Sequence, residues 1–404
     1  MRGEVSLGSL LARVETGWSP ACDAYPPAVD EWGVIKVSGV TSGNFDPNEA
    51  KRLPASLQPR QHLEIQPGDV LVARANGARS LVGAVCQVGP TRRKLMLSDK
   101  ILRLIPDGNL AESAFLAILL RSAGVRQQIG NLLNGGTGQN NISQMDLREL
   151  VVPDVSLTEQ RRIIAMHAAF ERRIGSVKGV LGKLRVAEQA LSTQALTPAQ
   201  RNEWDRVPLE SVATVAAGVT LGSEPVGGGT VVLPYLRVAN VLDGRIDTTD
   251  LKQVRILSTQ YARYALKQGD LLLTEGGDLD KLGRGAVWDS RIEQCLHQNH
   301  VFRVRCRERL MPDFLALYTA SAAGRAYFQR VGKQTTNLAS INSTQVKKMP
   351  VPVPPMDEQE RLLGPIWAVR KRAEVLGKQI TKIRTVQRGI VEDLLAGHSK
   401  ASDA

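Results

Sequence analysis

The sequence predicts a mixed α/β (α+β) chain with an internal two-fold repeat. In this fold class, two tandem globular domains are separated by a pair of long antiparallel coiled-coil helices. Two observations support it. A stretch of about 40 residues with helical apolar spacing occurs twice, and corresponding residues in the two halves lie 199 positions apart, as Glu159 and Glu358 do. We therefore expect two domains, each followed by one helix: 1–153, 154–200, 201–355 and 356–404.

The first domain alternates short apolar runs with turn residues, which is typical of strands. A helical stretch and a loop rich in Gly and Asn follow. We expect strands at 32–37, 69–73, 82–88 and 100–105, the helix at 112–129 and the loop at 134–141.

The first long helix is expected at residues 158–196. Thr158 offers an N-capping side chain, and Glu159 faces the positive end of the helix dipole. Apolar residues recur at steps of three and four, which is the spacing of a coiled-coil seam. A helix of about 40 residues is about 60 Å long, too long for one domain to cover. The seam consists of Ile163, Phe170, Ile174, Val177, Leu181, Leu184 and Leu191.

The second half repeats this plan. The natural partner of each long helix is the other one, and the domain between them favours antiparallel pairing. We expect strands at 234–241, 270–273, 285–288 and 301–305, a helix at 312–331 and the second long helix at 357–396, where Asp357 offers the N-cap. The second seam consists of Leu362, Val369, Ala373, Leu376, Ile380, Ile383 and Ile390.

Two features oppose a regular helix pair. Pro365 should kink or delay the second helix, because proline lacks an amide proton and clashes with the preceding turn. Gly175, Gly179 and Gly182 each cost the first helix about 1 kcal/mol relative to Ala. These glycines mark either weak helix or the close approach of another chain.

The repeat extends into the globular domains. Gly68-Asp69 and Gly269-Asp270 lie 201 positions apart. Similarity between the domain interiors is weak, which fits two modules with different targets and fits drift without selection equally. The pairs 199 positions apart are Phe115 and Phe314, Arg126 and Arg325, Thr137 and Thr336, Ile142 and Ile341, and Pro153 and Pro352.

Composition indicates a soluble, cytoplasmic protein. The net charge is +12 without a dense lysine run, which favours specific contact with a polyanion, although a merely basic protein has the same balance. No apolar run approaches the length of a membrane span, and the first residues do not resemble a signal peptide. The four cysteines show neither zinc-site spacing nor a disulfide framework.

The sequence predicts no catalytic and no metal site. It contains no phosphate-binding loop, and the glycines at 135–138 follow a helix instead of the strand that a dinucleotide site requires. Asp30, Glu49 and Lys51 are the residue types of a nuclease metal site, but they have no equivalent in the second half, and we treat them as a chance match. The five histidines form no spaced cluster.

With no catalytic or metal site predicted, binding is the function class that remains. Arg can bond guanine, and Asn or Gln adenine, through two hydrogen bonds each, while Lys and Thr suit phosphates. Such side chains occupy predicted loops in both domains, although a solvated surface role is the simpler alternative for any single one. The candidate DNA contacts are Arg74, Asn76, Arg79, Arg92, Arg93, Lys94, Gln139, Asn140 and Asn141 in the first domain, and Arg237, Asn240, Lys281, Arg284, Asn299, His300, Lys333, Thr336 and Asn337 in the second.

Several motifs together resemble the specificity subunits of Type I restriction-modification systems. Each domain ends in a Thr-x-x-x-x-Ile segment, at 137–142 and 336–341, followed by a lead-in rich in Val and Pro. The long helices then open with Glu159-Gln160-Arg161-Arg162 and Glu358-Gln359-Glu360-Arg361. Leu395-Ala396-Gly397 is similar to the end of the last helix in these subunits. The resemblance covers essentially the whole chain, although residues 337–339 depart from the first copy's 138–140.

The resemblance implies a DNA-recognition subunit that is not an enzyme and binds no cofactor. Its two target-recognition domains would each recognise half of a bipartite DNA sequence, and its helices would dock two methyltransferase subunits. Those partners use S-adenosylmethionine to methylate adenine, and the complex can recruit two restriction subunits that use ATP and Mg²⁺. The alternatives are a specificity subunit serving a fused methyltransferase-endonuclease, a self-contained DNA-modifying enzyme, and a coiled-coil scaffold without DNA function.

Overall fold

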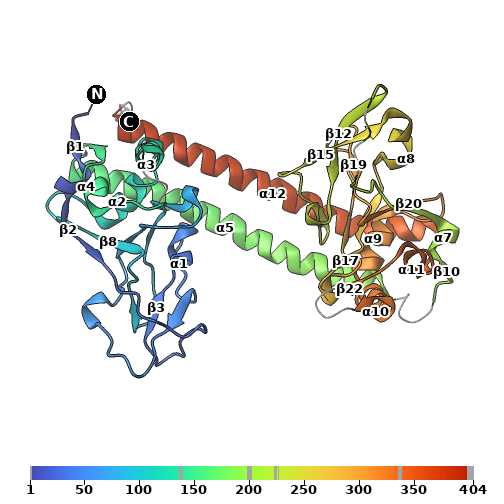
Figure 1. The fold of residues 1–404 in the computed structure, drawn as a ribbon, viewed down its shortest axis with the longest axis horizontal. Coiled ribbons are helices and arrows are strands. Elements are labelled where there is room, and N and C mark those ends of the chain that lie inside the picture. The colour runs from blue at the N-terminus through green and yellow to red at the C-terminus, as the bar shows by residue number, and fades with distance from the viewer. Residues whose placement is uncertain are drawn as a thin grey trace. The chain divides into compact units, whose positions relative to one another are not determined.

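The chain forms two compact units (Figure 1). The computed structural model describes residues 2–135, 140–197, 203–222, 225, 227–334 and 339–397. Unit 1 combines Met1–Gly179 with Gly377–Ala404, and unit 2 consists of Val180–Leu376. Each long helix therefore contributes one part to each unit. Three of the candidate DNA contacts, Gln139, Thr336 and Asn337, lie outside the described residues.

Unit 1 is built on two small sheets. The antiparallel sheet has the strand order β2-β8-β5-β6, and the second sheet has the order β4-β3-β7 with β3 and β7 parallel. β1 pairs with β9, which brings the start and end of the domain together. The strands are β1 (Glu4–Ser6), β2 (Leu11–Thr16), β3 (Gly33–Ile35), β4 (Ala50–Arg52), β5 (Val70–Ala73), β6 (Val85–Gln87), β7 (Leu95–Met96), β8 (Ile101–Pro106) and β9 (Val151–Pro153).

Alternating side chains of β5 separate two cores in unit 1. Val70 and Val72 face the helices and pack with Phe115, whereas Leu71 faces the three-stranded sheet and packs with Leu95. All of these residues are buried. The helices are α1 (Ser38–Thr41), α2 (Ser113–Leu119), α3 (Ala123–Gly135), α4 (Gln144–Arg148) and parts of α5 (Leu157–Ala195) and α12 (Met356–Ala396); the 3₁₀ turns are η1 (Leu7–Leu10), η2 (Gln61–Leu63) and η3 (Arg79–Leu81).

Unit 2 repeats this topology, with sheet orders β11-β20-β16-β18 and β15-β12-β19 and with β12 and β19 parallel. β10 pairs with β23 as β1 does with β9. The main strands are β10 (Arg206–Pro208), β11 (Ala213–Ala216), β12 (Thr230–Leu236), β15 (Lys252–Leu257), β16 (Leu271–Thr274), β18 (Gly285–Val287), β19 (Leu296–His297), β20 (Val301–Cys306) and β23 (Pro350–Pro352).

Smaller elements complete unit 2. β13 pairs with β14, and β17, β22 and β21 form a three-stranded sheet. These strands are β13 (Val241–Leu242), β14 (Arg245–Ile246), β17 (Gly276–Gly277), β21 (Lys333–Gln334) and β22 (Ala339–Ser340). The helices are α7 (Leu209–Val212), α8 (Tyr261–Tyr264), α9 (Pro312–Ala320), α10 (Ala322–Val331) and α11 (Ser343–Lys347), and the 3₁₀ turns are η4 (Val238–Asn240), η5 (Ser258–Gln260) and η6 (Leu279–Lys281).

A glycine at the same place in each unit lets two backbone segments touch. A Cβ atom on Gly17 would lie 2.0 Å from the Leu97 carbonyl oxygen, and one on Gly218 would lie 1.9 Å from that of His297. Because no side chain fits at these distances, only glycine is tolerated. This pair, 201 positions apart, shows that the repeat reaches into the domain interiors, where sequence similarity is weak.

The shared Gly-Asp pair makes a tight turn before β5 and β16. Gly68 and Gly269 have φ of +94° and +86°, a conformation that favours glycine. Asp69 accepts the Gln66 amide at 2.9 Å, and Asp270 accepts the Lys267 amide at 2.7 Å. Each aspartate thereby fixes the entry into a central strand.

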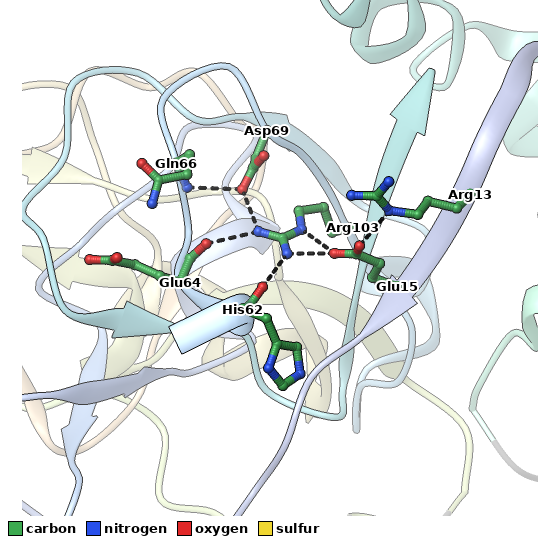
Figure 2. Close-up of polar contacts among 7 residues, drawn as sticks. All are labelled: Arg13, Glu15, His62, Glu64, Gln66, Asp69 and Arg103. Carbon is green, nitrogen blue, oxygen red and sulfur yellow. Dashed lines mark hydrogen bonds and ion pairs between the residues drawn. The ribbon is translucent and has the colours of Figure 1, made fainter. Parts of the chain in front are cut away.

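A buried arginine holds the turn of unit 1 in place. In Figure 2, Arg103 of β8 lies among Glu15, Asp69 and the carbonyl groups of His62 and Glu64. Its guanidinium donates to Glu15 at 2.8 Å, to Asp69 at 3.1 Å and to the two carbonyls at 2.9 and 2.8 Å. Burial raises the pKa of Glu15, but hydrogen bonds and charge from Arg103 and Arg13 outweigh it and hold that pKa below its ordinary value.

The prediction of a single helix within each domain is wrong, because each domain has two. Residues 112–129 form α2 and part of α3, and residues 312–331 form α9 and α10. At the second break Ser321 is extended, with φ −69° and ψ 164°, and its hydroxyl accepts the Gly324 amide. That hydroxyl also donates to the Tyr318 carbonyl. Apolar periodicity continues across the break, so it could not reveal this local cap.

The strands agree in part with expectation. β3, β5, β8, β16, β18 and β20 lie within or beside the ranges predicted for them, whereas β12 begins four residues before the predicted 234–241. The strand expected at 82–88 is shorter, because residues 82–84 follow η3 as a turn. No strand was predicted at the positions of β1, β2, β4, β9, β10, β11, β15 or β23.

Both long helices begin one residue before the expected start. Ser156, and not Thr158, accepts the Glu159 amide, at 3.4 Å. Asp357 lies inside the first turn of α12, where its charge still meets the positive helix end.

The expectation that Pro365 delays the second helix is wrong. α12 begins at Met356 and continues through Pro365 to Ala396. The neighbouring side chains of Leu363 and Ile366 are buried in the core of unit 2. Their packing outweighs the one hydrogen bond that the proline removes.

The expected seam is buried for much of its length. Ile163, Ile174, Val177 and Leu376 are buried, but Ile390 is exposed, so its place on the seam is wrong. Val391 and Leu395 enter the core of unit 1 instead. A straight helix drifts from a 3.5-residue repeat, and near its end α12 turns its apolar face to the domain. The half-buried seam residues are Phe170, Leu181, Leu184, Leu191, Leu362, Val369, Ala373, Ile380 and Ile383.

Candidate nucleic-acid interface and helix anchors

A buried glutamine fixes the start of α5 to unit 1. The Gln160 side chain has no exposed surface. Its Oε1 accepts the Glu112 amide at 3.0 Å, and its Nε2 donates to the carbonyls of Leu110 and Val155, both at 2.8 Å. Gln160 therefore satisfies three backbone groups where the domain, the connecting segment and the helix meet.

Gln359 does the same at the start of α12 in unit 2. Its Oε1 accepts the Met311 amide at 2.8 Å, and its Nε2 donates to the carbonyls of Arg309 at 3.0 Å and Pro354 at 2.8 Å. The Glu-Gln motif thus joins each domain rigidly to its helix. Its recurrence 199 positions apart was visible in the sequence, but the role of the glutamine was not.

The helices pair antiparallel within each unit. In unit 1, Gln387 Nε2 of α12 donates to Glu171 Oε1 of α5 at 3.0 Å, while Val391 and Leu395 share a core with Ile163, earlier in α5. Later positions of one helix therefore meet earlier positions of the other.

Unit 2 contains the equivalent contact. Arg370 Nε of α12 donates to Glu188 Oε1 of α5 at 2.6 Å, and Ala195 shares a core with Leu363 and Ile366. Glu188 and Gln387 are 199 positions apart, as are Glu171 and Arg370, so the polar interruption expected from the sequence is an interhelical contact in both units.

In unit 1, three segments meet at the end of β5, and we call residues 74–77, 100, 140 and 141 the unit 1 edge. The Arg74 amide donates to the Lys100 carbonyl at 2.8 Å, and the Asn76 amide donates to the Asn140 carbonyl at 3.2 Å. Asn140 Nδ2 returns a bond to the Gly77 carbonyl at 3.0 Å. A cleft of about 410 Å³ lies here, lined by Val37, Ala75, Asn76, Gly77, Lys100, Asn140 and Asn141.

Unit 2 joins the same three segments at the end of β16, and we call residues 275–277, 300, 339 and 340 the unit 2 edge. The Glu275 amide donates to the His300 carbonyl at 3.0 Å, and the Ile341 amide donates to the Glu275 carbonyl at 2.8 Å. The equivalent bond in unit 1 runs from Ile142 to Arg74, at 2.9 Å. The two edges are therefore built alike.

The side chains at the two edges differ. Unit 1 presents amide groups and a lysine, whereas unit 2 presents His300, whose Nδ1 lies 2.5 Å from Glu275 Oε2, beside two glycines. Amides, lysine and a histidine–carboxylate pair offer different hydrogen-bond patterns to a ligand. Asn140, Asn141 and His300 are among the predicted contacts. Lys100 and Glu275 are not, because no local sequence signal marks them and only the fold brings them beside the others.

Several candidate side chains are engaged inside the protein. Arg92 donates to the carbonyls of Pro27, Ala28 and Glu31 at 2.6–3.1 Å and so holds that loop. Lys94 Nζ donates to the Asp30 carbonyl at 2.8 Å. These two residues stabilise the surface beside the second sheet.

The same is true of candidates in unit 2. Asn240 is buried and bonds the Arg237 amide and the carbonyls of Asp247 and Asp250 at 2.9–3.1 Å. Arg237 forms an ion pair with Asp250 at 2.8 Å. Lys281 is paired with Asp278, while Arg93 and Lys333 are exposed.

Within the described ranges, no three His, Cys, Asp or Glu side chains lie close enough together to hold a metal ion. Glu49 of the nuclease-like combination instead accepts a bond from Ser38 Oγ at 2.6 Å and pairs with Lys36 at 3.0 Å. The hydrogen bond from Ser38 and the charge of Lys36 lower the pKa of Glu49.

As far as the chain is described, no helix is both long and apolar enough to cross a membrane.

Comparison with known proteins agrees with this arrangement. A family model, the Type I restriction modification DNA specificity domain, matches residues 201–367. The chain is 24% identical over 380 residues to the Type I restriction enzyme EcoKI specificity subunit of Escherichia coli, over 90% of this chain and 80% of that protein. It is 33% identical over 198 residues to the EcoEI specificity subunit of Escherichia coli, over 48% of this chain and 33% of that protein.

A solved structure extends the likeness to the fold. It comes from work on complex assembly and conformational transition of the type I R-M system, and it covers 97% of each chain at 19% identity with a TM-score of 0.56. The chain is thus a duplicated unit of one domain and one long helix, with a polar edge at the same place in each unit. Along 90% of its length the chain is similar to a specificity subunit of a Type I restriction enzyme, and residues 201–367 match the DNA specificity domain of these systems.

Proposed function

We propose that the chain recognises a bipartite DNA sequence, one half with each unit, and carries methyltransferase subunits on its helices. The repeated edge is the observation that supports this most strongly. The same backbone framework presents different side chains in the two units, as two modules for different half-sites require. A scaffold without DNA function would not need this contrast.

The bases are contacted from the two edges. In unit 1, Asn76, Asn140 and Asn141 suit adenine, and Arg74 suits guanine. In unit 2, His300 and Asn299 provide donors or acceptors, and Glu275 can accept from cytosine. Arg79, Arg93, Arg284 and Lys333 contact phosphates, while Arg92, Lys94, Arg237, Asn240 and Lys281 hold the loops in place.

In this proposal the partner subunits carry out the methylation and cleavage reactions. Two methyltransferase subunits bring S-adenosylmethionine, and two restriction subunits, where present, bring ATP and Mg²⁺. Methylated adenine then marks each half-site. A fused methyltransferase-endonuclease would use the same recognition surfaces.

The test is the genome-wide adenine methylation of the host with and without this gene, with the methyltransferase expressed in both strains. One bipartite motif should lose its methylation on deletion and regain it on complementation. An unchanged pattern, together with equal affinity of the purified complex for all duplexes in competition with random DNA, would overturn the proposal.

A further inference from the structure

Unit 2 contains a pocket at a place that the side chains of Arg121 and Glu392 occupy in unit 1. Its volume is about 700 Å³. The walls come from α5, α9, the start of α10, the turn between β13 and β14, β18 and Arg370 of α12. All of these segments belong to unit 2. The lining residues important here are Arg185, Thr193, Asp313, Ala320, Ala322 and Arg325.

The equivalent place in unit 1 holds a carboxylate. Glu392 of α12 accepts the amide of Ala123, the first residue of α3, at 2.7 Å. A carboxylate is favoured there, because the first turn of a helix has amide groups without intrahelical acceptors and carries the positive end of the dipole. Glu392 thus ties the end of α12 to the domain.

An arginine side chain also lies at that place in unit 1. Arg121, between α2 and α3, donates to the carbonyls of Gly43 at 2.6 Å and Val85 at 3.2 Å. Burial lowers its pKa. Its long side chain therefore occupies the space between the helices and the sheet of unit 1.

Unit 2 lacks both side chains. At the 199-residue offset, Thr193 replaces Glu392 and Ala320 replaces Arg121, while Ala322 corresponds to Ala123. Thr193, Ala320 and Ala322 all line the pocket. In unit 1 the start of α3 faces the carboxylate of Glu392. In unit 2 the side chains of Thr193 and Ala320 are short, so the start of α10 faces a cavity instead.

The charges of the pocket leave a positive group without a partner. Arg325 is paired with Asp243, Arg370 with Glu188, and Asp313 accepts the Trp367 indole N–H at 3.0 Å. Arg185 has no hydrogen-bond or ion-pair partner in the part of the chain that the structure describes. An entering carboxylate would therefore meet Arg185 and the α10 N-terminus.

We propose that this pocket receives an acidic side chain of a methyltransferase subunit, in the position that Glu392 occupies in unit 1. The inference rests on the proposed function, because that function supplies the partner. A protein segment suits the site better than a free anion, since the volume far exceeds one carboxylate and Ala316, Leu317 and Ala320 add apolar walls. Docking at unit 2 then depends on charge in a way that docking at unit 1 does not.

A substitution copied from unit 1 tests this. Thr193→Glu places a carboxylate at the position equivalent to Glu392, where it should occupy the pocket. Thr193→Gln is the control, because glutamine is as large as glutamate but carries no charge. Titration calorimetry of the full chain with purified methyltransferase should show one of the two binding steps weakened by tenfold or more in Thr193→Glu relative to Thr193→Gln. DNA affinity of the chain alone should be equal in the two variants.

A second measurement does not need the partner. If the pocket accepts a carboxylate, Thr193→Glu should raise the Tm of the chain by about 1–3 °C over Thr193→Gln, since a charge at a helix N-terminus stabilises it. Equal Tm values, or equal methyltransferase affinity in the two variants, would overturn the inference. Wild-type chain that binds no methyltransferase would overturn the proposed function and this inference with it.

Discussion

Single buried polar residues decide how the domains hold their helices. Gln160→Leu keeps the volume of the side chain but leaves the amide of Glu112 and the carbonyls of Leu110 and Val155 without partners. Each unsatisfied buried group costs about 1–3 kcal/mol, so the loss of three partners should lower the free energy of unfolding by at least about 3 kcal/mol.

Urea denaturation measures this loss. Gln194→Leu, at an exposed position of the same helix, serves as the control and should change stability by less than about 0.5 kcal/mol. Equal effects of the two substitutions would show that Gln160 does not anchor the helix.

A buried histidine should make unit 2 sensitive to acid. Burial lowers the pKa of His297 from 6.5 to about 4. Between these values the unfolded chain binds a proton that the folded chain excludes, so stability is full above pH 6.5 and falls as the pH decreases toward 4. The loss approaches about 3 kcal/mol at the lower end.

Leu97 occupies the equivalent position in unit 1, where the Trp18 amide bonds its carbonyl as the Val219 amide bonds that of His297. His297→Leu is therefore a matched control that should flatten the pH dependence of unfolding between pH 4 and 6.5. A slope that persists in this variant would assign the sensitivity to other groups.

At the scale of elements, long helices were predictable and their surroundings were not. The steps of three and four from Ile163 to Leu191 identify a helix without help from the rest of the fold. In contrast, β7 and β19 have two residues each, too few for a periodic signal, and Ser321 breaks a helix through its own hydroxyl. Ile390 was misplaced because the apolar face turns toward the domain at the helix end.

The candidate site was predictable in composition but not in assembly. The Asn and Arg residues with base-binding side chains can be found in the sequence, yet Asn240 and Arg92 differ from Asn140 and Arg74 in what surrounds them. Loops about 65 residues apart form each edge, as Asn76 and Asn140 do. Such a juxtaposition is a property of the sheet topology, which one sequence does not display.

Helix length should set the spacing between the half-sites. Three heptads inserted into both α5 and α12, beside Gly179 and Gly377, add about 32 Å at about 1.5 Å per residue. This is close to one turn of B-DNA, so each domain would still face its groove. The spacer, which is the DNA between the two half-sites of the methylated motif, should lengthen by about 9–10 base pairs, and the half-sites should not change.

Methylation sequencing gives the result, and the same insertion in α5 alone is the control. That variant loses the register of the Glu171–Gln387 and Glu188–Arg370 contacts and should lose activity. If the double insertion left the spacer unchanged, the helices would not separate the recognition domains.

For the whole molecule, the repeat predicts modular specificity. Replacing residues 1–153 with the same region of a relative should change one half of the methylated motif and leave the other half intact, because each domain has its own cores and its own glutamine anchor. Changes in both halves would show that the two units recognise DNA jointly. A reciprocal exchange of residues 201–355 should change the other half.

The way the chain is divided between the units also decides when each unit can complete its fold during synthesis. Unit 2 is one continuous segment, whereas unit 1 needs Val391 and Leu395 in its core and Glu392 at the start of α3. Those residues are synthesised about 240 residues after the end of the first domain at residue 153, which takes about 12–48 s at about 5–20 residues per second. Until then the first domain lacks part of its core, so we expect a chain truncated before Val391 to expose apolar surface there although all residues of its first globular domain are present.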